Sequence, residues 1–341
     1  MNRRLVWRLA QVGFVAVVAA FIVARLASTW GTITAYSWHL SLGPLLASVL
    51  LFLAFYWLNG LAWWLLLRGF ALDAGLSGSV ALWGQSILAR YVPGNVFMFL
   101  GRALLAQRRG LALEPVGAAM VYEQALSFAG ALVTAAVLFP FAHDEPAAAL
   151  WGLIGVPVIL VMLHPRVFSP LAARLLRALH RPPLEVVLPY RRVLALLALF
   201  IATWLVVGGA AFTFAAGVAG AGRGAFVPVT AGYALGFVAG MVAVVVPSGI
   251  GVREAVLAAT LAGSLPAGVA LAWALLLRLW QTVLELVFVA LASLLGRRDG
   301  RRGESAEART QSAEAESAET RAEPTEAREP FTGSTRREDA T

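Results

Sequence analysis

Six long apolar runs constrain what this chain can fold into more than any other feature. They cover residues 5–27, 42–67, 116–139, 147–163, 193–216 and 267–295. A helix of about 20 apolar residues crosses the roughly 30 Å hydrocarbon core of a bilayer, and 147–163 is near the lower limit of this length. Charged residues make up only 13% of the chain, against roughly 25% in soluble domains. Together these features predict an all-α polytopic membrane protein.

Two further apolar stretches are broken by proline and glycine. The arms 79–91 and 96–108 flank Pro93-Gly94-Asn95, and the arms 226–246 and 252–262 flank Pro247-Ser248-Gly249-Ile250-Gly251. These residues keep the arms from fusing into one helix, and three of the four arms are too short to span a bilayer alone. Each pair, 79–108 and 226–262, is therefore predicted to be a re-entrant helical hairpin, which enters and leaves the membrane on one side. The alternative is a kinked pair of ordinary helices, and it is strongest for the second pair because 226–246 is long enough to cross.

The distribution of arginine predicts the orientation. All 27 basic residues are arginine, and cytoplasmic segments of membrane proteins are enriched in basic residues. Arginines gather at the amino end, near 68, at 102–109, at 166–192 and at 297–302, whereas the loops 28–41, 141–146 and 217–225 hold one between them. Six spans and two hairpins then predict a multi-pass protein of the plasma membrane with both termini in the cytoplasm. The hairpins open toward opposite sides, as an inverted repeat would produce.

Composition divides the chain into a transmembrane domain, 1–296, and a tail, 297–341. The tail has almost no apolar bulk to offset the entropy of ordering, which predicts a disordered cytoplasmic segment. Within the transmembrane domain, 165–183 alternates leucines with arginines and is predicted to lie as an amphipathic segment on the inner leaflet.

Ionisable residues inside spans are costly in free energy, which makes them candidates for function. In the last span Arg278, Gln281 and Glu285 follow one another at i, i+3 and i+7, on a single helix face. Glu123 lies within the span 116–139. The alternatives are a structural ion pair in the last span and a carboxylate reaching toward the interface for Glu123.

The hairpins bring helix N-termini into the membrane, where unpaired backbone N–H groups and the helix dipole favour anions. Val96 and Val252 are the predicted first residues of these helices, with Asn95 and Ser248 near the capping positions. The sequence therefore predicts an anion-binding cavity between the two helix starts.

Two arginines in the hairpins could bind a phosphate in the predicted cavity. Arg102 lies two turns into the first inner helix and Arg253 begins the second, and a guanidinium can bind phosphate through two hydrogen bonds. Glu254 could pair with Arg253 or with Arg278. Anchoring at the membrane interface is the alternative for Arg102.

The two breaks also resemble a known family. Arg90-Tyr91-Val92-Pro93-Gly94-Asn95-Val96, followed by Gly101-Arg102, is similar to the Y-[LIV]-P-G segment of the lysylphosphatidylglycerol synthase transmembrane-region family. Pro247-Ser248-Gly249-Ile250-Gly251-Val252-Arg253-Glu254 looks like its P-G-G-[LIV]-G-x-R-E segment, with Ser248 in place of a glycine.

This family includes the flippase portion of the multiple peptide resistance factor, which translocates aminoacylated phosphatidylglycerol. The resemblance covers most of 1–296 in arrangement. It implies roles for Pro93, Gly94, Arg102, Pro247, Gly249, Gly251, Arg253 and Glu254. Because the chain lacks the soluble aminoacyl-transferase domain, we do not expect it to synthesise the lipid.

The sequence thus predicts a flippase or scramblase that moves a phospholipid, an aminoacyl-phospholipid or a polyprenyl-phosphate lipid between leaflets. We expect membrane lipids as partners, with a lipid-modifying enzyme or a second copy of the chain as further candidates, and no nucleic acid. No catalytic residue, metal site or cofactor is expected, since the chain has no cysteine and its four histidines lack a metal-ligand spacing. The alternatives are a small-solute or ion transporter, a membrane-embedded transferase, and a non-transporting partner of a lipid synthase or glycosyltransferase.

Overall fold

The computed structural model describes residues 23–24, 27–91, 96–143, 149–178, 187–242, 251–261 and 265–322. The chain divides into two compact units, Met1–Gly296 and Arg297–Thr341. All regular structure in the described residues is helical, which confirms the predicted all-α class. The α-helices are α2 Trp30–Ala35, α3 Leu42–Gly69, α4 Leu76–Ile87, α5 Val96–Gln107, α6 Leu113–His143, α7 Ala149–Met162, α8 Pro165–Ala178, α9 Tyr190–Ala219, α10 Phe226–Val242, α11 Val252–Thr260 and α12 Ala267–Ala322.

Five helical stretches in the described residues are long and apolar enough to cross a membrane. They are Leu42–Gly69, Leu113–Ala142, Tyr190–Ala219, Arg223–Val242 and Gly268–Gly296. A helix satisfies its own backbone hydrogen bonds, so it can lie in lipid where no water is available. Four of these stretches correspond to the predicted spans 42–67, 116–139, 193–216 and 267–295. The predicted run 5–27 lies almost wholly outside the described residues.

The predicted full span 147–163 contains a shorter described helix. Its helix, α7, has only 14 residues and meets α8 across a bend of 71°. The two together have the length and apolarity of one broken span. The bend follows from Pro165 at the start of α8, because proline cannot continue the preceding helix. In α8 the side chains of Arg174 and Arg177 are exposed and Ala172 is buried, as in an amphipathic helix; residues 179–186 are outside the described residues.

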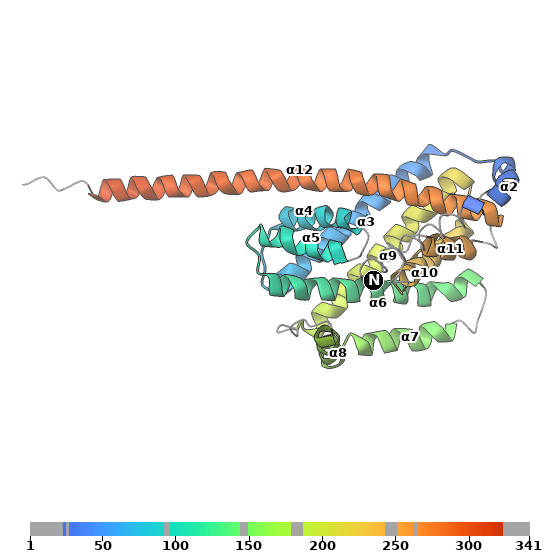
Figure 1. Ribbon diagram of the computed structural model, residues 1–341, viewed down its shortest axis with the longest axis horizontal. Coiled ribbons are helices and arrows are strands. Elements are labelled where there is room, and N and C mark those ends of the chain that lie inside the picture. The colour runs from blue at the N-terminus through green and yellow to red at the C-terminus, as the bar shows by residue number, and fades with distance from the viewer. Residues whose placement is uncertain are drawn as a thin grey trace, which may run out of the picture. The chain divides into compact units, whose positions relative to one another are not determined.

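Each broken pair is present as two separate helices. α4 continues into a 3₁₀ turn, Leu88–Tyr91, and packs beside α5 (Figure 1), while α10 packs beside α11. The Arg109 guanidinium donates to the Gly78 carbonyl oxygen at 2.6 Å and so ties the end of the first pair to its beginning. The breaks themselves, 92–95 and 243–250, lie outside the described residues.

The two helices of the second pair differ in length, unlike the arms of a symmetrical hairpin. Arg223–Val242, which includes α10, is long enough to cross a membrane, whereas α11 has only nine residues. By length, α10 can be a span in its own right, followed by a half-length helix.

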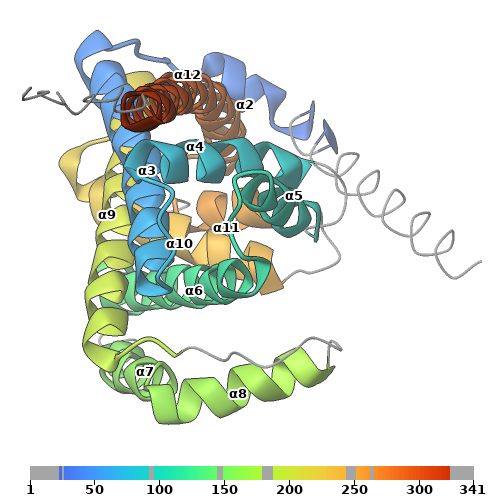
Figure 2. The ribbon, with the colours of Figure 1, turned by 90° about the vertical axis from the view of Figure 1, so that its left-hand side faces the viewer.

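Long helices surround the broken pairs. In unit 1, α3 lies along α9, and α6 contacts α9 and α10 (Figure 2). Close approach in α10 depends on Gly232 and Gly236, spaced by four residues on one face. The carbonyl oxygen of Arg253 would lie 3.2 Å from a Cβ built on Gly236. Small residues allow helix backbones to approach in membranes, where lipid provides no hydrophobic force between helices.

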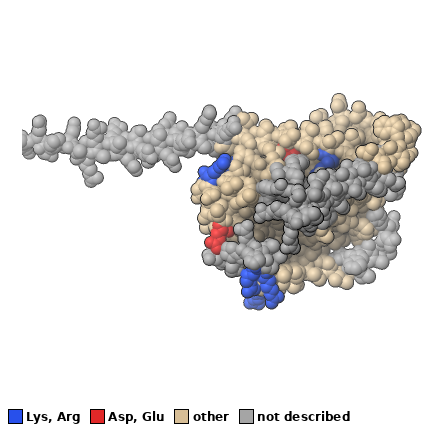
Figure 3. Space-filling model, in the orientation of Figure 1, with Lys and Arg blue, Asp and Glu red and all other residues tan. Residues whose placement is uncertain are grey.

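The order of elements repeats within unit 1. A long helix, a broken pair and a second long helix occur as α3–α6 and again as α9–α12. Charged side chains are sparse on the face of the described residues in Figure 3, where they form separate groups on a neutral background. Whether the two halves are inverted across the membrane remains a prediction.

The tail differs from its prediction in one respect. Helix α12 is assigned through Ala322, so Arg297–Ala322 is helical, and 323–341 lie outside the described residues. Alanine, glutamate and arginine dominate this segment, and all three have high helix propensity. The prediction of disorder considered the missing apolar core and not this local preference.

Candidate functional site

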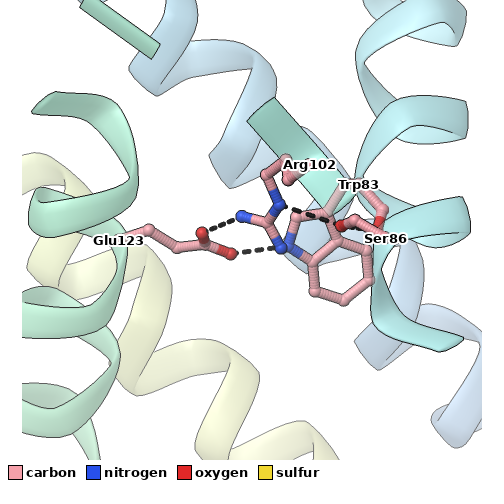
Figure 4. A network of polar contacts seen from close by, with 4 residues as sticks. All are labelled: Trp83, Ser86, Arg102 and Glu123. Atoms are coloured by element: carbon pink, nitrogen blue, oxygen red, sulfur yellow. Dashed lines mark hydrogen bonds and ion pairs between the residues drawn. The ribbon is translucent and has the colours of Figure 1, made fainter. Parts of the chain in front are cut away.

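A buried ion pair joins the first broken pair to α6. The Arg102 guanidinium, 1% exposed, contacts the Oε2 atom of Glu123, and its Nε donates to Ser86 Oγ at 2.9 Å (Figure 4). The indole N–H of Trp83 donates to Glu123 Oε1 at 2.6 Å. Both carboxylate oxygens therefore have a donor, which offsets the cost of placing a charge in a low-dielectric region.

Aromatic packing completes the surroundings of Arg102. Its guanidinium carbon lies 4.6 Å from the centroid of the Trp63 ring on α3. A cation is attracted to the negative face of an indole, and the attraction is largest where water is excluded. Arg102 is thus held by α3, α4 and α6 together, and the interface-anchor alternative does not describe its position.

A second charged group lies at the start of α11. Glu254, 4% exposed, accepts a hydrogen bond from the Gly251 backbone N–H at 2.6 Å, and its other oxygen lies 4.0 Å from Arg278 on α12. A carboxylate at the third helical position that binds back to the N-cap satisfies a donor that the helix cannot. The neighbouring guanidinium of Arg253 lies over the rings of Tyr233 and Phe237, at 5.3 and 5.9 Å.

The polar face predicted on the last span has two separate partners. Gln281 accepts a hydrogen bond from the Tyr233 hydroxyl at 2.7 Å. Glu285, fully buried, accepts from the Tyr56 hydroxyl at 3.2 Å, and the Tyr56 ring stacks on Phe288. Gln281 therefore faces α10 whereas Glu285 faces α3.

One cavity of about 230 Å³ connects the two charged groups. Eight helices contribute to its wall: α3, α4, α5, α6, α9, α10, α11 and α12. Its charged lining residues are Arg102, Glu123, Arg253 and Arg278. The polar lining residues are Asn59, Gln124, Ser127, Thr203 and Gln281, and eight rings, including those of Trp204 and Tyr233, cover much of the remainder. Glu285 does not line it.

The two halves place corresponding side chains around this cavity. Trp83 and Tyr233 each lie seven residues after the start of their helices, α4 and α10, and each donates a hydrogen bond to the long helix that follows its broken pair. The inner helix then forms an ion pair with that long helix, as Arg102 with Glu123 and as Glu254 with Arg278. In the first half the arginine is on the inner helix and the glutamate on the long helix, whereas in the second half these positions are reversed.

The structure brings most of the predicted site residues together. Arg102, Glu123, Arg253, Arg278 and Gln281 line the cavity, and Glu254 lies behind Arg278. α5 begins at Val96 and α11 at Val252, which confirms the predicted helix starts. Gly251 is described, with φ of +86° at the N-cap of α11. The other predicted break residues lie outside the described residues: Pro93, Gly94, Asn95, Pro247, Ser248 and Gly249.

Several site residues were not among those predicted from the sequence. Trp63, Trp83, Tyr56 and Tyr233 read as ordinary aromatic members of apolar runs, and only their hydroxyl or indole groups distinguish them from phenylalanine. A polar tip on a buried ring usually has a hydrogen-bond partner, and that rule could have marked them. Among the described residues, no cluster of three or more histidine, aspartate or glutamate side chains could hold a metal ion.

Comparison with known proteins does not assign the chain. No model of a known protein family matches it, and no curated protein matches it significantly. The family resemblance rests on the two break motifs and remains an expectation.

Proposed function

We propose that unit 1 is a lipid transporter, a flippase or scramblase that moves the headgroup of a phosphate-bearing lipid between leaflets while the tails stay in the bilayer. The observation that carries the proposal is the cavity between the two broken pairs, with Arg253 and Arg278 in its wall. Arginines within spans are costly, and they mark substrate pathways in membrane proteins.

The size of the cavity supports a headgroup in preference to a whole lipid. Sites for drug-sized ligands measure roughly 300–1,000 Å³, and this cavity measures about 230 Å³. A lipid with two acyl chains cannot fit, but a phosphate with a short polar substituent can. The break motifs add the resemblance to a lipid-transporting family. The candidate lipids are a phospholipid, an aminoacyl-phospholipid and a polyprenyl phosphate.

The proposal includes a place and partners for the protein. The arginine distribution favours a plasma membrane with both termini in the cytoplasm. Membrane lipids are the primary partners, and a lipid-modifying enzyme that produces the headgroup is a further candidate. We propose no catalytic activity and no cofactor.

A reconstitution assay tests the proposal. The purified full chain is placed in liposomes with headgroup-labelled lipids, and transport is scored as fluorescence newly reached by a membrane-impermeant quencher. We expect faster loss of fluorescence than in protein-free liposomes. Arg253→Ala should slow the process because it removes a guanidinium from the cavity wall, whereas Arg174→Ala, on the exposed face of α8, should not. No acceleration with anionic, zwitterionic, aminoacylated or polyprenyl lipids would refute lipid transport.

The same liposomes distinguish lipid transport from the main alternative, which is transport of a small solute. A small-anion transporter would admit a soluble glycerophosphodiester into sealed liposomes, since the cavity can hold that group without its tails. Uptake of the soluble probe without lipid movement would favour solute transport.

A further inference from the structure

The side chain of Arg253 lies over two rings of α10. Its guanidinium carbon is 5.3 Å from the centroid of the Tyr233 ring and 5.9 Å from that of Phe237. These two residues are four positions apart, so they share one face of α10. A Cβ built on Gly236 would lie 3.2 Å from the Arg253 carbonyl oxygen. The start of α11 therefore approaches α10 closely enough for the Arg253 side chain to lie across the ring platform, Tyr233 and Phe237.

The ring platform is held in place by α12 and α9. The Tyr233 hydroxyl donates to Gln281 Oε1 on α12 at 2.7 Å, and both side chains are buried. The Phe237 ring lies 4.6 Å from the Trp204 ring on α9. A satisfied hydrogen bond between buried side chains makes both of them more rigid. Gln281 thus fixes Tyr233, and Tyr233 fixes the surface on which Arg253 lies.

Contact with rings leaves the N–H donors of Arg253 available. A guanidinium has five N–H donors in its plane, and a ring below that plane takes none of them in an ordinary hydrogen bond. In the part of the chain that the structure describes, no oxygen accepts a hydrogen bond from this side chain and no carboxylate lies within 4.0 Å of it. Arg102 differs, since it is bound to Glu123 and Ser86. Arg253 is partly exposed and lines the cavity, so its donors can bind a ligand there.

We infer that Tyr233, held by Gln281, is a positioning residue that orients Arg253 to bind two oxygens of the headgroup phosphate at once. Two parallel N–H···O bonds form only when the guanidinium fork faces the anion. A platform that fixes the side chain beforehand lowers the entropy lost on binding, which raises affinity. The inference rests on the headgroup site of the proposed function and adds the residues that orient its arginine.

Single variants in the liposome assay give the first test, with headgroup-labelled phosphatidylglycerol as the lipid. Tyr233→Phe keeps the ring and removes its hydrogen bond to Gln281, and it should slow transport about three- to tenfold. Arg253→Lys keeps the charge without the fork and should slow transport by about tenfold. The control Tyr190→Phe also loses a hydrogen bond, to the Leu160 carbonyl oxygen, but Tyr190 does not line the cavity and the rate should not change. Transport by Arg253→Lys at the rate of the unaltered chain would overturn the two-pronged contact.

The Arg253→Gln background separates positioning from packing. If Tyr233 acts through Arg253, Tyr233→Phe has no further effect once the arginine is gone. If the hydrogen bond to Gln281 only holds α10 against α12, Tyr233→Phe slows transport by the same factor with or without Arg253, and the inference is wrong. Rates are measured at a protein density that keeps the slowest variant above protein-free leakage.

Binding of a soluble headgroup separates this inference from lipid transport itself. Thermal unfolding of the detergent-solubilised chain with increasing glycerophosphoglycerol gives an apparent Kd. We expect this Kd to rise about three- to tenfold in Tyr233→Phe, and Tyr233→Phe to add nothing in the Arg253→Gln background. That result without lipid movement would keep the inference and reject the transporter, whereas lipid movement with an unchanged Kd in Tyr233→Phe would do the opposite. Tighter binding of inorganic phosphate than of glycerophosphoglycerol would overturn the assignment to a lipid headgroup.

Discussion

Each oxygen of the Glu123 carboxylate has its own donor, and the two donors come from different helices of one broken pair. Trp83 of α4 binds Oε1 and Arg102 of α5 binds Oε2. Breaking a buried pair by removing one partner leaves an uncompensated charge, while replacing both by apolar groups leaves none. The position of the pair in the cavity wall therefore fixes α4 and α5 against α6.

Substitution of one partner should destabilise the protein more than substitution of both. We expect Arg102→Met to lower the free energy of unfolding by about 3–5 kcal/mol, and the double variant Arg102→Met with Glu123→Leu to recover most of that loss. The free energy of unfolding is measured on the purified protein in mixed micelles with an increasing fraction of denaturing detergent. The exposed Arg177→Met variant is the control. A double variant no more stable than the single one would show that the carboxylate has other stabilising partners.

Helix contacts in the second half depend on residues without side chains. A methyl group built on Gly232 of α10 would overlap the side chain of Thr260 on α11. Added volume in a tightly packed contact lowers stability, and a smaller side chain at the contacting residue can restore it. The half-length helix α11 holds Arg253 and Glu254, so this contact positions the charges of the cavity.

An added methyl group at this contact should separate α10 from α11. We expect Gly232→Ala to cost about 1–3 kcal/mol of stability and to raise hydrogen exchange in α11. The double variant with Thr260→Ala should regain most of the loss because it frees the space. Gly155→Ala in α7 has nothing within 4 Å of the new methyl group and should be neutral or stabilising. Equal exchange in α11 for Gly232→Ala and Gly155→Ala would contradict the contact.

For the whole molecule, the orientation in the membrane is a prediction from arginine placement. The cytoplasmic side is predicted to hold α8, and the outer side the loops at 28–41 and 217–225. Because the chain has no cysteine, single cysteines can report sidedness without a background.

Labelling of single cysteines in intact cells should reveal this orientation. A membrane-impermeant maleimide should modify Ser37→Cys and Arg223→Cys directly, but Arg174→Cys only after permeabilisation; all three positions are exposed. The reverse pattern would invert the topology, and equal labelling of Arg174→Cys and Ser37→Cys would reject it.

Sequence by itself determined the class of the protein, most of its spanning helices and the two residues, Val96 and Val252, at which the inner helices begin. These features are local. Apolar length sets where a helix can lie in lipid, and proline and glycine set where it must stop. The predicted run 147–163 is three residues longer than the described helix α7, and two of the three, 147 and 148, lie outside the described residues.

Only the tertiary structure decided which polar residues share a cavity. Arg278, Gln281 and Glu285 lie on one helix face, but neighbouring helices divide them, so that Arg278 and Gln281 line the cavity and Glu285 contacts Tyr56. Partners far apart in sequence, such as Trp83 and Glu123, meet through helix packing, which no local pattern encodes. Sequence reasoning predicted charged residues within apolar runs; helix packing decided which of them form ion pairs, as Arg102 does with Glu123 and Glu254 with Arg278.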